Sequence, residues 1–125
     1  RNMTNSRQKG KRGELEACRE MEKVLTGTTW RRSQQFCGKA GDADIIGVDK
    51  LHVEVKRREA GTKTLYSWMA QAVEDARATD TPLVLTRSNG EDWLAVIYLQ
   101  DLPSLHKILR GIYENGDFTN IQENQ

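Results

Sequence analysis

Three residues near the middle of the chain have the types and spacing of a site that could hold a metal ion beside an amine. Glu54 and Lys56 lie two positions apart in the apolar, β-branched run 51–57, and Asp44 lies ten positions before Glu54. Alternation at period two predicts a strand, on which Glu54 and Lys56 share one face. A preceding antiparallel strand over 43–48 would bring Asp44 close to Glu54.

Carboxylates that converge in this way repel one another unless a cation lies between them. Two like charges about 4 Å apart repel by roughly 1 kcal/mol in water, and by more in a drier site. A divalent metal would remove that cost. The simpler alternative is that the alternate polar residues form the solvated face of a hairpin. We favour the metal site because Asp44 lies in an apolar strand, Glu14 lies on a preceding helix and basic residues flank the run.

The remaining sequence predicts the elements that position these residues. Apolar residues recur at helical spacing over three segments, and β-branched or aromatic runs separate them. The predicted helices cover 13–26, 65–78 and a short stretch after Asp101, and the other predicted strands cover 28–33, 82–86 and 93–99. The resulting order, α-β-β-β-α-β-β-α, predicts an α/β fold with a small mixed sheet flanked by helices.

The length of 125 residues suits one domain. We expect a flexible basic arm over 1–11, a single domain over 12–113 and a polar tail over 114–125. Two cysteines and two histidines, none at paired ligand spacing, argue against a structural zinc site. With no apolar run of membrane-spanning length and no recognisable signal peptide, the sequence predicts a cytoplasmic protein.

Basic residues concentrate in the first half of the chain. The net charge is only +1, but residues 1–63 contain 15 Lys and Arg against 9 Asp and Glu, whereas residues 64–125 contain 4 against 9. A basic half on a near-neutral chain indicates a surface for polyanions, although chance clustering would produce the same balance.

Four short motifs, taken in order, resemble the PD-(D/E)xK nuclease superfamily. They are Glu14 on the first helix, Ala43-Asp44, Glu54-Val55-Lys56 and Gln71 on the next helix. Within the superfamily, the chain is most similar to the archaeal-type Holliday junction resolvases and their phage relatives, because of its basic run 9–14 and the segment 30–33. The similarity covers about residues 9–100, and Ala43 stands where the family often has Pro.

The resemblance implies a restriction-endonuclease-like fold and a nuclease that uses Mg²⁺, with Mn²⁺ able to substitute. The implied metal ligands are Glu14, Asp44, Glu54 and the Val55 carbonyl. Lys56 would orient the attacking water, and Gln71 would be an auxiliary polar residue of the active site. Two simpler interpretations stay open. Glu14 also suits a first helical turn, where the helix dipole favours an anion, and Gln71 could be an exposed helix residue.

The implied DNA surface consists of basic residues and one hydroxyl around the metal site. They are Arg7, Lys9, Lys11, Arg12, Arg31, Arg32, Ser33, Lys39, Arg57, Arg58 and Lys63. Such phosphate contacts give affinity with little base specificity and a steep salt dependence. Ser33 could instead be a strand-end residue in solvent. Asp42 and Asp49 are more typical of turns than of ligands. His52, on the same strand face as Glu54, could line the groove or simply be exposed.

The resemblance therefore implies a Mg²⁺-dependent, structure-selective DNA endonuclease that resolves four-way junctions as a homodimer in DNA recombination and repair. If it is phage-encoded, it would act in the host cytoplasm. The alternatives are a related nickase, flap or restriction-like endonuclease, and a non-catalytic nucleic-acid-binding domain. A comparison of cleavage on junction, flap, single-stranded and duplex DNA separates these possibilities.

Overall fold

The computed structural model describes residues 2–33 and 42–115, except for the side chains of 2–7, 9 and 115. The elements are α1 (Asn2–Val24), β1 (Arg31–Arg32), β2 (Ile45–Ile46), β3 (Leu51–Lys56), α2 (Thr62–Asp75), β4 (Thr81–Thr86), β5 (Leu94–Val96), a 3₁₀ turn (Leu99–Asp101) and α3 (Leu102–Asn115). The predicted α/β class and the predicted order of helices and strands are confirmed. Within the described ranges, no helix is both long and apolar enough to cross a membrane.

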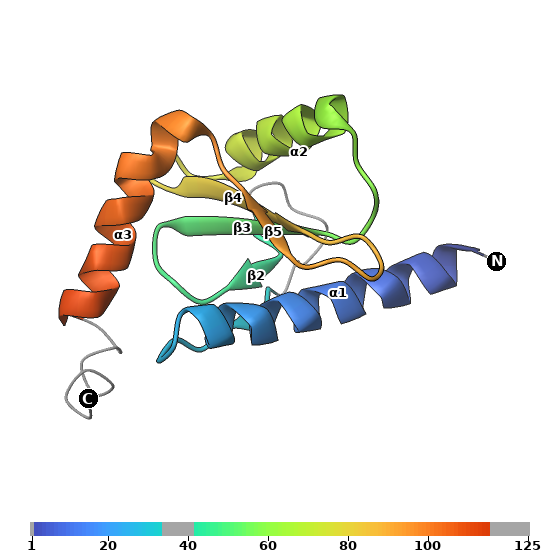
Figure 1. The fold of residues 1–125 in the computed structure, drawn as a ribbon, viewed down its shortest axis with the longest axis horizontal. Coiled ribbons are helices and arrows are strands. Elements are labelled where there is room, and N and C mark those ends of the chain that lie inside the picture. The colour runs from blue at the N-terminus through green and yellow to red at the C-terminus, as the bar shows by residue number, and fades with distance from the viewer. Residues whose placement is uncertain (1, 34–41, 116–125) are drawn as a thin grey trace.

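A five-stranded mixed sheet forms the centre of the fold. Its strands lie in the order β1-β2-β3-β4-β5. β3 and β4 run parallel and are connected through α2, whereas the other neighbouring strands pair antiparallel. Figure 1 shows α1 and α2 on opposite sides of the sheet. The parallel pair is therefore covered on both faces, as parallel strands generally are.

β3 divides its side chains between the two faces of the sheet. Leu51 and Val53 pack with buried residues of α1, while α2 packs its own buried residues against the other face. Because alternate strand residues point to opposite faces, His52, Glu54 and Lys56 project toward the α2 side. His52 and Glu54 are 3% and 6% exposed. Buried polar groups are costly unless they have partners, so this pair marks a candidate site.

The first helix is longer than the sequence predicted. It begins at Asn2, whereas we expected a flexible arm over 1–11 and a helix only over 13–26. The arm was expected because its residues show no apolar periodicity. No proline interrupts the segment, however, and its Arg, Lys, Gln and Met residues have favourable helix propensities that offset Gly10 and Gly13. The basic residues of this segment are therefore carried on a helix.

Two smaller differences concern packing and strand length. Leu15, one of the apolar residues at helical spacing in 13–26, is 45% exposed, whereas Ala17 is fully buried. Cys18 lies in the core. β1 and β2 contain two residues each, although longer strands were predicted over 28–33 and 43–48. β1 lies at the edge of the sheet, where a short strand limits the number of unpaired backbone groups.

Candidate active site

Asp44 and Glu54 meet at the start of β2. The Asp44 N–H donates a hydrogen bond to the Val53 carbonyl at 2.9 Å, and Asp44 Oδ2 accepts one from the Val55 N–H at 2.8 Å. Val53 and Val55 flank Glu54 on β3, so these two contacts hold the Asp44 carboxyl beside Glu54. The Asp44 carboxyl is close enough to Glu54 for its charge to raise the pKa of the Glu54 carboxyl. The predicted antiparallel hairpin is confirmed, and it brings these two acids together.

Glu54 is buried between a histidine and this second carboxyl. Its side chain is 8% exposed, and its Oε2 lies 2.7 Å from His52 Nε2. Burial raises the pKa of Glu54 above its ordinary value of 4.5, and the charge of Asp44 adds to this rise, while the His52 hydrogen bond opposes it. A pKa raised in this way means that the anion is poorly compensated. The pair therefore favours a proton or a cation between its oxygens.

Glu14 approaches Asp44 from α1. Its Oε1 accepts a hydrogen bond of 2.7 Å from Arg32 Nε. Burial raises the pKa of Glu14, and the charge of Asp44 also raises it, whereas Arg32 lowers it. Asp44 is thus electrostatically coupled to both glutamates. Arg32, expected to contact DNA, instead pairs with Glu14 within the protein.

The acidic side chains fit a hard divalent cation at the Asp44–Glu54 pair. Carboxylate oxygens are the ligands that Mg²⁺ and Mn²⁺ prefer, and Mg²⁺ keeps several waters when few protein ligands are available. Among the residues described by the structure, no group of three or more His, Cys, Asp or Glu side chains is arranged to hold a metal. Glu14 is coupled to Asp44 but held by Arg32. The predicted ligand set of three acids and the Val55 carbonyl therefore stays a prediction. Its centre is the Asp44–Glu54 pair.

Lys56 lies at the end of β3 on the same face as Glu54. Its Nζ is 6.0 Å from the centre of the Trp68 ring, and the Arg58 guanidinium is 5.7 Å from the same ring. Trp68 is 4% exposed and belongs to the core cluster between α2 and the sheet. The ammonium group makes a cation–π contact with this ring, which helps to hold it near the end of the strand.

The other predicted residues are placed at different distances from the acids. The Ser33 N–H donates to the Asp44 carbonyl at 3.0 Å, which places Ser33 beside the site. Ser33, Asp42 and His52 also line a groove of about 560 Å³. Gln71 is exposed on α2, which agrees with the simpler interpretation of that residue. Asp49 is 83% exposed in the β2–β3 turn, as expected for a turn residue.

The predicted DNA-contacting residues divide into exposed and internal groups. The exposed ones are Lys11, Arg12, Arg31, Arg58 and Lys63. Lys39 lies outside the described residues, as do the side chains of Arg7 and Lys9.

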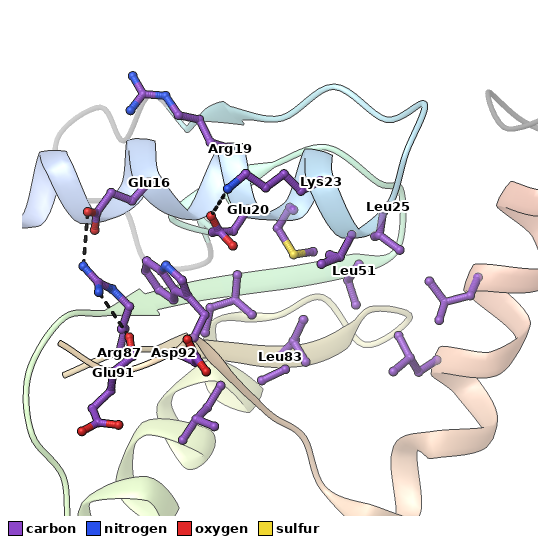
Figure 2. Close-up of a pocket in the computed structure, with 18 residues that line it drawn as sticks. Glu16, Arg19, Glu20, Lys23, Leu25, Leu51, Leu83, Arg87, Glu91 and Asp92 are labelled. Atoms are coloured by element: carbon purple, nitrogen blue, oxygen red, sulfur yellow. Dashed lines mark hydrogen bonds and ion pairs between the residues drawn. The ribbon is translucent and has the colours of Figure 1, made fainter. Parts of the chain in front are cut away.

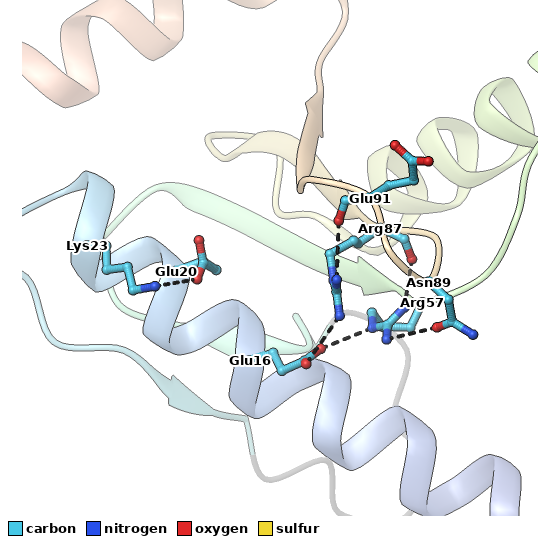
Figure 3. Close-up of polar contacts among 7 residues, drawn as sticks. All are labelled: Glu16, Glu20, Lys23, Arg57, Arg87, Asn89 and Glu91. Carbon is cyan, nitrogen blue, oxygen red and sulfur yellow. Dashed lines mark hydrogen bonds and ion pairs between the residues drawn. The ribbon is translucent and has the colours of Figure 1, made fainter.

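Arg57 belongs to the internal group, which corrects its expected place on the DNA surface. Its side chain is 13% exposed, and its Nε donates to Glu16 Oε1 at 3.0 Å. Its two terminal nitrogens donate to the Arg87 carbonyl at 2.9 Å and to Asn89 Oδ1 at 3.2 Å. Figure 3 shows these contacts linking α1 to the segment after β4. Every guanidinium nitrogen is engaged, so Arg57 holds α1 against the end of β3.

The Arg57 stem requires glycine at position 13, which gives a stability test. A Cβ at Gly13 would lie 2.4 Å from Arg57 Cγ, whereas a Cβ at Gly10 would meet nothing within 4 Å. We expect Gly13→Ala to lower the free energy of unfolding by about 1–3 kcal/mol because of overpacking. Gly10→Ala should raise it by up to about 1 kcal/mol through helix propensity. Denaturant unfolding compares the two, and equal stability of both variants would contradict this packing.

The raised pKa values predict how the metal-free protein responds to pH. The folded state retains protons on Glu14 and Glu54 that the unfolded chain releases as pH rises through about 4.5. Stability contributed by these groups therefore falls from pH 4.5 up to their higher folded values. We expect Glu54→Gln, measured by denaturant unfolding in a chelator, to gain stability relative to wild type across that window. If the stability difference between Glu54→Gln and wild type shrinks as pH rises, the raised pKa of Glu54 is contradicted.

A second hollow, of about 770 Å³, lies away from the acids. It is bounded by α1, β4, β5 and α3, with an apolar floor that includes Leu51 and Leu83 (Figure 2). Glu16 and Arg87 lie at its rim and are joined by an ion pair of 3.4 Å. None of Glu14, Asp44 and Glu54 lines this hollow, so it is separate from the candidate active site.

Two neighbours of the acids, His52 and Arg32, have positions that the sequence did not predict. The sequence allows His52 either to line a groove or to be exposed, whereas β3 buries it against Glu54. The available signal was its position two residues before Glu54 on a strand that proved to be central. Arg32 was assigned to DNA, and no sequence signal pairs it with Glu14, because the two residues are distant in the chain.

Comparisons with known proteins agree with the predicted fold and with the predicted nuclease superfamily. The Holliday junction resolvase Hjc of Archaeoglobus fulgidus, an archaeal hyperthermophile, has a similar structure, with a TM-score of 0.50 and 21% sequence identity. The match covers 71% of this chain and 72% of the resolvase, which supports the predicted restriction-endonuclease-like fold. Among curated proteins, none matches the sequence. The family model described as "Phage putative PDDEXK endonuclease" matches residues 5–124. The chain therefore belongs to this family of PD-(D/E)xK endonucleases.

Proposed function

We propose that this nuclease hydrolyses DNA phosphodiester bonds with the help of Mg²⁺, and that its preferred substrates are branched DNAs such as four-way junctions. The observation that carries the proposal is the placement of the Asp44 carboxyl beside Glu54 by its 2.8 Å bond from the Val55 N–H, with Lys56 on the same strand face as Glu54. Two neighbouring acids would normally repel. A cation that both acids bind would remove this repulsion.

Each residue has a distinct part in the proposed reaction. Asp44 and Glu54 would hold the cation, with the Val55 carbonyl beside them and Glu14 completing the acidic set. When bound, the cation would polarise the phosphodiester and lower the pKa of an attacking water. Lys56 would orient that water and neutralise charge that develops on the phosphate. Arg32 keeps the Glu14 carboxyl in place by their 2.7 Å contact.

Exposed basic residues would bind the DNA backbone around this site. Lys11 and Arg12 lie on α1 just before Glu14, while Arg58 and Lys63 follow β3. Contacts between such residues and phosphates are insensitive to sequence. They suit an enzyme that selects its substrate by shape. The affinity for DNA should fall steeply as salt rises.

The preference for four-way junctions rests on the motif pattern and on the fold shared with a resolvase. Resolution of a junction requires two symmetric nicks, so we also propose that the enzyme works as a homodimer. These two proposals can fail while the nuclease assignment stands. A flap endonuclease or nickase would use the same acids and lysine on a differently shaped substrate.

A cleavage panel with and without Mg²⁺ tests the proposal. The purified protein is incubated with four-way junction, flap, single-stranded and plain duplex DNA of matched sequence. We expect metal-dependent, paired nicks in the junction that exceed cutting of the duplex. Faster cutting of flap or duplex DNA would replace the junction assignment. No cleavage of any substrate with Mg²⁺ or Mn²⁺, despite DNA binding, would indicate a non-catalytic domain.

A further inference from the structure

His52 is buried beside the Asp44–Glu54 pair, on the face of β3 that α2 covers. We propose that His52 is a positioning residue, which orients the Glu54 carboxylate for a divalent cation by donating a hydrogen bond to Oε2. This role rests on the proposed nuclease function. It adds a histidine to the site without making it a ligand or a proton-transfer group.

The direction of the hydrogen bond follows from the ionised form of Glu54, the form that would bind a cation. His52 Nε2 lies 2.7 Å from Glu54 Oε2, which is the length of a charge-assisted hydrogen bond. An ionised carboxylate can only accept, so the proton must be on Nε2 when Glu54 is an anion. The side chains are 3% and 8% exposed, so water competes little for this contact. A bond in such surroundings is stronger than one at the surface.

The contact completes a pattern in which each acid of the site has at least one donor. Arg32 donates to Glu14 at 2.7 Å, the Val55 N–H donates to Asp44 at 2.8 Å, and His52 contacts Glu54 at 2.7 Å. A carboxylate offers about four lone-pair positions, so one donor leaves others for a cation. These three donors are the Arg32 guanidinium, the Val55 backbone amide and the His52 imidazole.

Glu54 needs such support more than Asp44 does. Asp44 has a short side chain that is already tied to the backbone of β3. Glu54 has an additional rotatable bond, and the nearby negative charge of Asp44 pushes its carboxylate away. Without the His52 donor, ordering Glu54 toward the cation would cost rotamer entropy and electrostatic free energy at the moment of binding. Carboxylates that bind metals are commonly held by hydrogen bonds of this kind.

Two substitutions separate the hydrogen bond from the shape of the imidazole. His52→Gln keeps an N–H donor at about the position of Nε2, whereas His52→Leu keeps an apolar side chain of similar size without a donor. His106→Leu on the exposed surface of α3 is the control. Mn²⁺ binding to each DNA-free protein is measured by calorimetry, and the Mg²⁺ concentration for half-maximal cleavage is measured in parallel. Circular dichroism confirms that each variant is folded.

We expect His52→Leu to weaken Mn²⁺ binding about 10–100-fold and to raise the Mg²⁺ requirement similarly, with DNA affinity unchanged. His52→Gln should stay within a few-fold of wild type, and so should His106→Leu. Equal Mn²⁺ affinity of wild type and His52→Leu would overturn the positioning role alone. Equal losses in the Leu and Gln variants would also overturn it, since the donor would then not matter. A wild type that neither binds Mn²⁺ nor cleaves DNA would overturn the nuclease function as well.

A measurement on the unmodified protein covers the case in which His52→Leu fails to fold. The ¹⁵N chemical shifts of an imidazole show which nitrogen carries the proton. We expect the Nε2 atom of His52 to carry a proton in the metal-free protein. The Nδ1–H tautomer would overturn the assignment, because Nε2 would then have no proton to donate to Glu54.

Discussion

Replacing Lys56 by methionine is expected to lower the rate of DNA cleavage by about 10²–10⁴-fold while DNA binding persists. Methionine keeps an unbranched stem that can rest on the Trp68 ring, but it lacks the ammonium group 6.0 Å from the ring centre. The loss is expected in kcat, since the ammonium acts on charge that develops in the transition state. Single-turnover cleavage at saturating Mg²⁺, with DNA affinity measured separately, checks the expectation.

Lys107→Met is the matched control for this change. Lys107 is an exposed residue of α3, and it belongs to none of the site residues named above. The same loss of one positive charge and the same new side chain should leave the cleavage rate within about twofold of wild type. If Lys56→Met cuts DNA as fast as Lys107→Met, Lys56 has no part in the chemistry.

Asp44→Asn should have opposite effects on activity and stability. Loss of the shared carboxylate should reduce cleavage by about 10³-fold, because a metal supplies several kcal/mol of transition-state stabilisation. Asparagine keeps an oxygen that can accept the 2.8 Å hydrogen bond from the Val55 N–H. It also removes the charge that raises the pKa of both Glu14 and Glu54. The free energy of unfolding without metal should therefore rise by about 1 kcal/mol at neutral pH.

Thermal denaturation in a chelator measures this gain, with Asp49→Asn as the control. Asp49 is 83% exposed in a turn, and its 3.6 Å contact with Arg77 is at the surface, so its loss should change stability little. A metal-free Asp44→Asn protein that is less stable than wild type would show that Asp44 is not repelled by the two glutamates. Cleavage that survives in Asp44→Asn would remove Asp44 from the site.

The sequence was sufficient for the order of elements and for the meeting of Asp44 with Glu54. Both follow from local patterns, namely period-two alternation in β3 and a short turn that joins it to β2. The register that carries Asp44 to the Val55 N–H then follows from the antiparallel pairing. Such predictions succeed because each depends on residues close together in the chain.

The parts that the sequence did not predict depend on distant residues or on burial. Arg57 was assigned to DNA because a basic residue after β3 is commonly exposed, but α1 and the segment after β4 enclose it through Glu16 and Asn89. His52 was undervalued because an alternating pattern does not show that helices cover both faces of a strand. The sequence does not predict the helix over 2–11 because that segment has no apolar face.

The central claim is that Asp44 and Glu54 share a divalent cation beside Lys56, and the most direct test is an anomalous diffraction map of crystals soaked in Mn²⁺. We predict a peak at about 2.0–2.6 Å from a carboxylate oxygen of each of these two acids, the range for hard cations with oxygen ligands. The peak should be lost in Asp44→Asn crystals. A wild-type map without a peak between Asp44 and Glu54, at a Mn²⁺ concentration that supports cleavage, would contradict the claim.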